Sequence, residues 1–332
     1  MQTEIITRAL ADLTRLRIMR LLAHMELAVG ELAHVLGQSQ PRVSRHVAIL
    51  CESGLAERRR EGSWIFLRQT ATPGATGPDA ATLPAAVARM LDVAEATDPA
   101  FAARCTQDRR QLAAIRSVRE RHAADYFARH AEDWDRLRAM LTPAEDVEAA
   151  LCRALGEAPL GRLLDIGTGT GRIAELLAPR SSHVVGFDRS PEMLRIARAR
   201  LQHRPPGGWE LVQGDFAALP FESDSFDTVI LHQVLHHAAE PAFPLAEAAR
   251  VCRPGGRVVI VDLAAHQREE LRERHAHARL GFTDEQIAGW LAAGGLEPAA
   301  PLALPGHQLT TKIWLAERRH GDHRTLQHKA AA

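Results

Sequence analysis

Apolar residues recur at helical spacing through the first fifty residues of the chain. One run extends from Ile5 to Leu22 and is interrupted near Asp12. A second run covers residues 29–36 and ends before a glycine, the residue that most readily closes a helix in the left-handed conformation. After a short polar turn, a third run extends from Pro41 to Leu50. Two short helices joined by a tight turn predict a helix-turn-helix.

The third predicted helix and the segment after it would present basic and polar side chains to DNA. Val43, Val47 and Leu50 form its buried face, and residues 54–68 are expected to be two strands around a Glu-Gly turn, a wing. Arginine pairs with guanine, glutamine with adenine, and wing arginines lie against phosphates. The predicted DNA-contacting residues are Gln40, Arg42, Ser44, Arg45, His46, Arg59 and Arg60. The alternative is a small helical domain in which the arginine triplet is only a solvated edge.

The remaining pattern divides the chain further. Residues 71–84 contain three prolines and two glycines, which predicts a linker. Residues 85–140 are helical in pattern and are expected to connect the two halves and to form a dimer. The apolar residues of the expected dimer seam are Val87, Met90, Leu91, Val93, Leu112, Ile115 and Val118. Residues 141–316 alternate apolar runs with amphipathic helices, which predicts a parallel sheet of βαβ units, and residues 317–332 are expected to be disordered. The strand-like runs are LLDIG, VVGFD, WELVQ, FDTVILH and GRVVIVDL.

The net charge of the whole chain argues against a nucleic-acid partner, whereas the charge of its first seventy residues supports one. The 41 basic and 41 acidic residues cancel over the whole chain. Residues 1–70, however, hold ten arginines against seven acidic residues, and the excess of acidic residues lies in residues 71–160. The four cysteines are far apart in the sequence and form no C-x-x-C pair, so neither a disulfide framework nor a cysteine zinc cluster is predicted. This pattern is typical of a protein in the reducing cytoplasm. The sequence has no apolar stretch long enough to predict a membrane span.

A glycine loop follows the first strand of the C-terminal half. Glycines at 167, 169 and 171 let the backbone approach a ligand closely, although this pattern alone suits a dinucleotide nearly as well. The next strand ends on Asp188, a carboxylate suited to ribose hydroxyls, and Met193 follows where it can pack on an adenine. Asp215 and Phe216, after the third strand, offer an acceptor for an adenine amine and an aromatic wall. The succession favours an adenosyl cofactor over a dinucleotide.

Two resemblances follow from these motifs. ALADLTRLRIMRLL, VGELAHVLGQSQPRVSRHVAILCESGL and AERRREGSW resemble the ArsR/SmtB winged-helix repressors over residues 4–70. The resemblance implies a homodimer on palindromic operator DNA that is released by an inducer. The cysteine pair of its metal-sensing members is absent from residues 26–32, and residues 85–97 offer Asp92 and Glu95 but no histidine, so no metal site is predicted.

The second resemblance is to class I S-adenosylmethionine-dependent methyltransferases, over residues 120–316. LLDIGTGTG, VVGFDRSPEML, LVQGDFAALPF, SFDTVILHQVLHH and RVCRPGGRVVIVDL are most similar to the ubiquinone/menaquinone branch. It implies an α/β fold in which a Rossmann-like domain binds S-adenosylmethionine or S-adenosylhomocysteine. A Rossmann-like domain without a cofactor is the alternative. The expected cofactor-binding residues are Tyr126, Asp165, Gly167, Thr168, Gly169, Gly171, Asp188, Arg189, Met193, Asp215, Phe216, Leu231 and His232.

Catalytic residues are less well specified by the sequence. A base is needed only if the methyl acceptor must lose a proton, and His232 and His236 are the candidates. Histidines at this position also serve packing or capping. His275 and His277 could line the acceptor side of the site, or serve only to pack against a capped helix. The chain lacks an Asn-Pro-Pro-Tyr element, which disfavours methylation of amino groups on nucleic-acid bases.

Three functions remain compatible with the sequence. The first is a repressor whose methyltransferase-like domain senses the adenosyl cofactor, which is favoured because regulators of similar layout are linked to the methionine and S-adenosylmethionine cycle. The second is an active small-molecule methyltransferase that regulates its own operon. The third is an enzyme that uses the winged helix only to dimerise.

Overall fold

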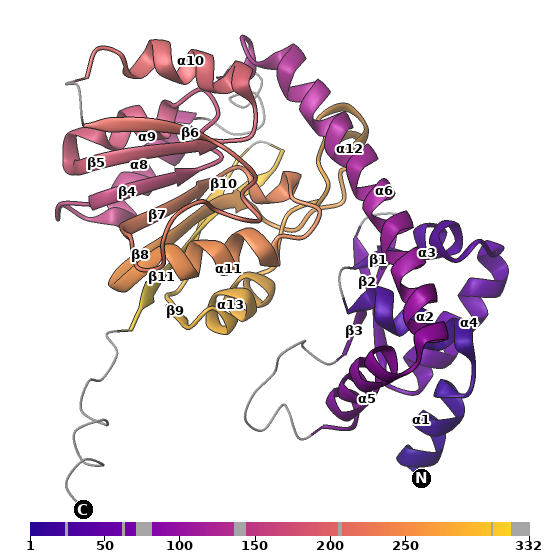
Figure 1. The fold of residues 1–332 in the computed structure, drawn as a ribbon. Helices are drawn as coiled ribbons and strands as arrows, with labels where there is room; N and C mark the ends of the chain where they lie inside the picture. The colour runs from indigo at the N-terminus through magenta and orange to yellow at the C-terminus, as the bar shows by residue number, and fades with distance from the viewer. Residues whose placement is uncertain are drawn as a thin grey trace, which may run out of the picture. The chain divides into compact units, whose positions relative to one another are not determined.

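The computed structural model describes residues 1–23, 26–61, 64–70, 82–135, 144–204, 208–306 and 308–319. Side chains are described throughout these ranges except at 59–61, 64, 115–124 and 273. Contacts divide the chain into two compact units, Met1–Arg121 and His122–Ala332 (Figure 1). The division falls within one helix, α6 (Pro99–His130), and each unit is described separately below.

The N-terminal unit packs its helices against a small antiparallel sheet of strand order β1-β3-β2. Asp12 explains the interruption in the first apolar run, because its carboxylate accepts hydrogen bonds from Thr14 N at 2.8 Å and Arg15 N at 3.2 Å and so caps a new helix. The elements are α1 (Gln2–Leu10), α2 (Leu13–Leu22), β1 (Leu27–Ala28), α3 (Val29–Leu36), α4 (Gln40–Glu52), β2 (Ala56–Glu61), β3 (Trp64–Gln69) and α5 (Leu83–Thr97), followed by α6. The predicted helix-turn-helix and wing are therefore present.

Ion pairs fasten α2 to the helices that follow the wing. Arg17 forms a two-pronged pair with Asp108 of α6, at 2.8 and 2.5 Å, and the Asp108 side chain is only 3% exposed. Arg20 contacts Asp92 and Glu95 of α5. Asp92 and Glu95, the acidic pair considered for metal binding, are thus engaged by arginine.

The expected dimer surface changes in the structure. Val87, Leu91 and Leu112 are buried in the core of their own unit, whereas Met90 and Val93 on α5 are exposed. The side chains of residues 115–124, which include the predicted seam residues Ile115 and Val118, lie outside the described side chains.

Helix α5 begins two residues before the end of the predicted linker, because Thr82 Oγ1 accepts a hydrogen bond from Ala85 N and caps the helix.

The C-terminal unit is a twisted sheet between two layers of helices. Its strand order is β10-β11-β8-β7-β4-β5-β6, with β9 beside β11. The five predicted strands are parallel, and β11 adds antiparallel to β8. The elements are α8 (Ala144–Leu155), β4 (Gly161–Ile166), α9 (Arg172–Leu177), η2 (Ala178–Arg180), β5 (Ser181–Asp188), α10 (Pro191–Leu201), β6 (Trp209–Gln213), β7 (Phe226–His232), η3 (Leu235–His237), α11 (Ala242–Val251), β8 (Cys252–Leu263), α12 (Glu270–Arg274), α13 (Asp284–Ala293), β9 (Leu296–Pro298), β10 (Leu302–Pro305) and β11 (Thr310–Arg318).

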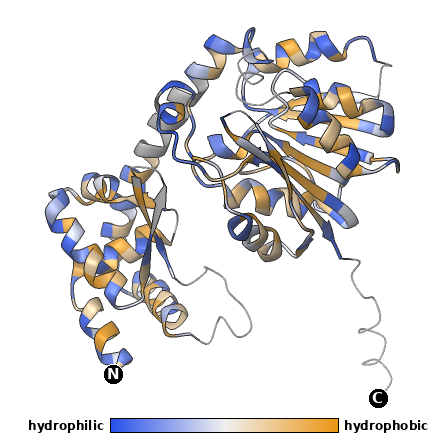
Figure 2. Ribbon diagram, turned by 180° about the vertical axis from the view of Figure 1, so that it is seen from behind, coloured by the Kyte–Doolittle hydropathy of each residue, from blue (hydrophilic) through white to orange (hydrophobic). Residues whose placement is uncertain are grey.

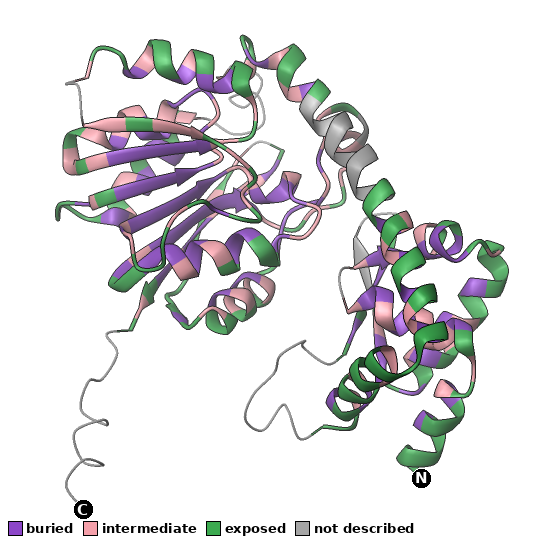
Figure 3. Ribbon diagram, in the orientation of Figure 1, coloured by how far each residue is buried: buried purple, intermediate pink, exposed green. Residues whose placement is uncertain are grey.

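The central strands of this sheet are strongly hydrophobic (Figure 2), and their alternate residues pack on opposite faces. On β4, Leu163 packs with α8 and α9, while Leu164 and Ile166 pack with α11 and α13. Both faces are covered, which is why the central strands read as continuous apolar runs and are buried towards their carboxyl ends (Figure 3). Because β4, β5, β7 and β8 are parallel, their carboxyl ends meet at one edge of the sheet.

The boundary at residue 317 is wrong. Glu317 and Arg318 belong to β11, where Glu317 pairs with Arg257 and Arg318 with Leu296. Arg318 also contacts Asp224 at 2.6 Å, so these residues are tied to the sheet. Residues 320–332 lie outside the described part of the chain. Among the helices that are described, none is both long and apolar enough to cross a bilayer.

Candidate functional site

The glycine loop turns back from the end of β4 against its two neighbouring strands. The amides of Gly167 and Thr168 both donate to Phe187 O, at 2.7 and 3.0 Å, which fixes the loop to the end of β5. Gly167 has φ +71°, and a Cβ there would stand 2.4 Å from Val234 Cγ2. Only glycine accepts both this conformation and this approach. Glycine at position 167 therefore lets the loop pack closely against Val234, which follows β7.

Asp188 ends β5 directly beside this loop. Its carboxylate accepts from Gly169 N at 2.8 Å and from Ser190 N at 2.9 Å. Burial raises the pKa of Asp188, and these backbone donors oppose the rise. In the part of the chain that is described, no cationic side chain pairs with it. A desolvated carboxylate that retains acceptor capacity fits the two hydroxyls of a ribose.

Binding of an adenosyl ligand is expected to weaken as the pH falls. Protonation of Asp188 would remove the acceptor on which the predicted ribose contact depends, and burial moves this protonation above the ordinary range of an aspartic acid. Below that raised pKa, affinity should drop by up to about tenfold per pH unit. Titration calorimetry with S-adenosylhomocysteine from pH 8 down to about pH 4, close to the ordinary pKa of an aspartic acid, measures this. Constant affinity over the whole range would contradict the assignment of Asp188.

Asp165 supports the loop from beneath. It is 1% exposed, in register between Gly186 of β5 and Ile230 of β7, and accepts from Thr168 Oγ1 at 2.7 Å. Its position makes it the residue that orients Thr168. The predicted contact of Asp165 with the amino-acid part of a cofactor stays a prediction.

The residues predicted around the adenine lie in different surroundings. The Met193 side chain is buried. Its backbone N donates to Ser190 Oγ at 3.2 Å, and this hydrogen bond caps α10. Asp215 is exposed and accepts from Ala217 N at 2.9 Å, while Phe216 is half-buried against the core. Arg189 is exposed, His232 is buried at the end of β7, and Leu231 is fully buried within the core.

Tyr126 lies in an aromatic group at the end of α6. Its ring centroid is 4.5 Å from that of His130 and 6.4 Å from that of Trp134, and its hydroxyl is hydrogen-bonded to His275 Nδ1 at 2.9 Å. Burial raises the pKa of Tyr126, so the phenol is neutral. A Cβ built at Gly169 would lie 3.7 Å from Trp134 Nε1, which places Trp134 against the glycine loop.

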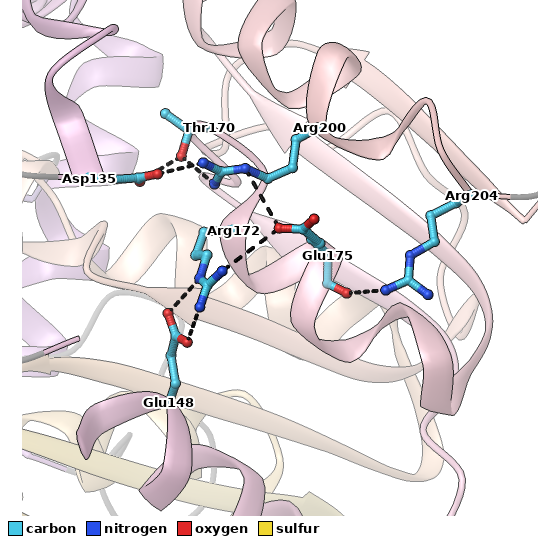
Figure 4. Close-up of polar contacts among 7 residues, drawn as sticks. All are labelled: Asp135, Glu148, Thr170, Arg172, Glu175, Arg200 and Arg204. Atoms are coloured by element: carbon cyan, nitrogen blue, oxygen red, sulfur yellow. Dashed lines mark hydrogen bonds and ion pairs between the residues drawn. The ribbon is translucent and has the colours of Figure 1, made fainter. Parts of the chain in front are cut away.

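A polar network fastens the segment after α6 to the glycine loop (Figure 4). Asp135 accepts from Thr170 Oγ1 at 2.8 Å and from Arg200 Nη2 at 2.6 Å, and Arg200 also donates to Thr170 Oγ1 at 3.1 Å. Glu175 lies 3.7 Å from Arg200 and 3.9 Å from Arg172. The loop, α9, α10 and the segment that carries Trp134 are therefore held as one assembly.

Histidines gather at the ends of β7 and β8, close to the aromatic group. His236 Nδ1 lies 2.7 Å from Asp262 Oδ1, and the rings of His236 and His277 are 4.2 Å apart. His237 stands 4.8 Å from Phe127, which in turn packs on Trp134. This group, and not an isolated side chain, surrounds the candidate base His236.

Two important residues were missed from the sequence. Asp262 is a carboxylate at the carboxyl end of a buried strand, the same signal that identified Asp188, and it could have been found on that basis. Asp135 carries no such signal, because its partners Thr170 and Arg200 are 35 and 65 residues away. Only the fold brings those groups together.

Among the predicted DNA-contacting residues of α4, the exposure agrees with the prediction except at one position. Gln40, Arg42, Ser44 and Arg45 are exposed on α4, opposite its buried stripe. His46 was expected to face outward, but its side chain is only 13% exposed and its Nδ1 lies 3.7 Å from Asp12 Oδ1. His46 borders the buried stripe and packs on the turn between α1 and α2.

The wing can be described only in part. Strands β2 and β3 pair antiparallel, and Arg58 on β2 is exposed. The predicted phosphate contacts Arg59 and Arg60 lie outside the described side chains, and the turn at 62–63 lies outside the described residues.

Two family models match separate parts of the chain. Residues 12–58 match bacterial regulatory proteins of the arsR family, and residues 164–260 match a methyltransferase domain. The same chain thus matches both models, in segments that do not overlap. Each matched segment coincides with a feature already described, the helix-turn-helix in one unit and the glycine loop with strands β4 to β8 in the other.

Curated relatives match part of the chain. Demethylmenaquinone methyltransferase of Tropheryma whipplei (strain Twist) is 34% identical over 156 residues, which cover 46% of this chain and 64% of that protein. The enzyme of Thermus thermophilus is 36% identical over 143 residues, covering 41% and 63%. An uncharacterized 37.1 kDa protein from a Streptomyces fradiae transposon is 40% identical over 121 residues, covering 35% and 34%. The chain spans less than two thirds of the length of these relatives.

A solved structure supports the fold. A SAM-dependent methyltransferase of Thermotoga maritima superposes with a TM-score of 0.50 at 21% identity, covering 60% of this chain and 100% of that one. The C-terminal unit therefore has the methyltransferase fold.

Proposed function

We propose that the protein is a DNA-binding transcriptional regulator whose C-terminal unit binds S-adenosylmethionine or S-adenosylhomocysteine, and that the adenosyl ligand changes its affinity for an operator. The continuous helix α6 carries this proposal. Its first half holds Asp108, which is paired with Arg17 next to the reading helices, and its last turn holds Tyr126 in the aromatic group by the glycine loop. A ligand that favours one position of Tyr126 can thereby bias the reader, provided that it binds the two states with different affinity.

The glycine loop and Asp188 would hold the adenosyl group. Asp188 would accept from the ribose hydroxyls, Asp215 from the adenine amine, and Phe216 and Met193 would flank the ring. Arg189 and Thr168 lie beside these positions in the chain. The cofactor, when it is S-adenosylmethionine, supplies a methyl group on a sulfonium. The chain's own contribution to transfer would be positioning and exclusion of water by Trp134 and Tyr126.

An active small-molecule methyltransferase is the second candidate, favoured by the similarity to demethylmenaquinone methyltransferases. If the acceptor must lose a proton, His232 at the end of β7 or His236 on η3 would take it. His236 Nδ1 faces Asp262, which would leave Nε2 for the acceptor. Incubation with methyl-labelled cofactor and cell extract tests for turnover, and a labelled small molecule would support this function.

Arg45→Ala is expected to weaken operator binding by about 1–3 kcal/mol, because an exposed arginine on α4 would lose its bidentate contact with a base. Fluorescence anisotropy with the operator, at a fixed salt concentration, measures the change. Arg104→Ala is the matched control, since Arg104 is exposed on α6 in the same unit but outside the reading helix. Equal affinities of the two variants would remove Arg45 from the reading set.

The homodimer on palindromic DNA belongs to this proposal. Met90 and Val93 remain exposed on α5 as apolar candidates for an interface. A winged helix that served only to dimerise an enzyme would bind no operator, so the anisotropy experiment also distinguishes the third function.

A further inference from the structure

Three imidazoles from two distant parts of the chain converge at one end of the large sheet. His236 and His237 lie on η3 after β7, and His277 follows α12. One ring nitrogen from each of the three lies within 4.8 Å of the others. The ring centroids are 4.1 Å apart for His236 and His237 and 4.2 Å apart for His236 and His277.

The partners of two of these rings fix which nitrogen carries the proton. His237 Nδ1 lies 3.0 Å from Ala276 O, and since a carbonyl only accepts, Nδ1 must be the donor. His236 Nδ1 donates in the same way to the carboxylate of Asp262, at 2.7 Å. Each ring therefore keeps a lone pair on Nε2. A ring N–H given to a carboxylate or a backbone carbonyl is the arrangement that orients metal-bound histidines.

Two of the ring nitrogens in this cluster are buried and have no hydrogen-bond partner among the described residues. They are His237 Nε2 and His277 Nδ1. A buried polar atom without a partner is costly in a native structure, and a bound ion removes that cost.

The backbone around the cluster is strained at two positions. Gln233, directly after β7, has φ +52°, and Ala276 has φ +53°. Ala276 stands between His275 and His277 and presents its carbonyl to His237. Non-glycine residues adopt this conformation only where their surroundings impose it, commonly at ligand sites.

We propose that His236, His237 and His277 bind a divalent first-row transition metal, with Zn²⁺ as the probe ion. Three imidazoles suit Zn²⁺ and its neighbours in the series, and a three-ligand site leaves a further position open. Asp262 is a positioning residue that fixes the ring of His236, and Ala276 O does the same for His237. The proposal goes beyond regulation by an adenosyl ligand.

X-ray absorption at the zinc edge tests the unmodified full-length protein. After dialysis against one equivalent of Zn²⁺, we expect a first shell that contains three imidazole nitrogens at about 2.0 Å. A shell dominated by oxygen, or with a single imidazole, would overturn the proposal. This measurement needs no variant, no DNA and no adenosyl ligand, so its failure leaves the proposed function untouched.

Variants test the individual ligands by calorimetry with Zn²⁺. His277→Phe and His237→Phe should lose the tight site, and Asp262→Asn should weaken it by about 10–100-fold. His183→Ala on β5, which lies outside the cluster, is the matched control and should bind as the unmodified chain does. Binding of S-adenosylhomocysteine by each variant reports that the unit is folded. Unchanged Zn²⁺ affinity in the folded His277→Phe and His237→Phe variants would refute the assignment.

Discussion

Asp188→Ala is expected to abolish measurable binding of S-adenosylhomocysteine. The carboxylate at the end of β5 is hydrogen-bonded by Gly169 N and Ser190 N and would accept from both ribose hydroxyls. Hydrogen bonds to a charged group contribute about 1.5–3 kcal/mol each, so losing two of them should weaken binding by at least about a hundredfold. Titration calorimetry on the full-length chain measures the loss.

Glu222→Ala is the control for this substitution. Glu222 is an exposed carboxylate of the same unit, and it lies outside the glycine loop and the strand ends around it. Its removal should leave the affinity unchanged. If Asp188→Ala binds the ligand as tightly as the control does, the ribose contact is made elsewhere and the site must be reassigned.

Asp108→Ala should destabilise the N-terminal unit by about 3 kcal/mol. The Asp108 carboxylate is 3% exposed and receives two hydrogen bonds from Arg17, whose side chain is 16% exposed. Removing one partner of a buried pair leaves the other charge without compensation, which costs more than the pair contributed. Hydrogen exchange at the amides of α2 and of the first half of α6 measures the change in that unit alone.

Asp92→Ala provides the comparison within the same set of helices. Asp92 pairs with Arg20 at 2.6 Å, but its side chain is 65% exposed and Glu95 also contacts Arg20. Exposed pairs contribute at most about 1 kcal/mol. Equal losses in the two variants would show that burial does not set the strength of the Arg17–Asp108 pair.

The parallel strands and their functional ends were predictable from the sequence for a physical reason. Strands covered on both faces are continuous apolar runs, so LLDIG and GRVVIVDL could be recognised as strands from the sequence. A carboxylate that directly follows such a run, as at Asp188, must lie at the carboxyl edge of the sheet. The residues themselves indicated an adenosyl group, and the family resemblance added which adenosyl cofactor to expect.

What the sequence did not reveal depends on contacts between distant segments. His236 and His277 meet only because α11, β8 and α12 return the chain to the same edge of the sheet. Strand β11 was missed because it follows β10 as an antiparallel return without an intervening helix. His46 was misplaced because it borders the buried stripe of α4, where the helical period alone does not decide which way a side chain packs.

The coupling of the two units is the central claim, and operator affinity during an S-adenosylhomocysteine titration tests it most directly. We expect the dissociation constant for operator DNA, measured by anisotropy, to change several-fold and to level off at the ligand concentration that saturates the calorimetric site. Asp188→Ala should show no change over the same titration. By linkage, the operator should shift the affinity for S-adenosylhomocysteine by the same factor. An operator affinity that stays constant at saturating adenosyl ligand would contradict the account.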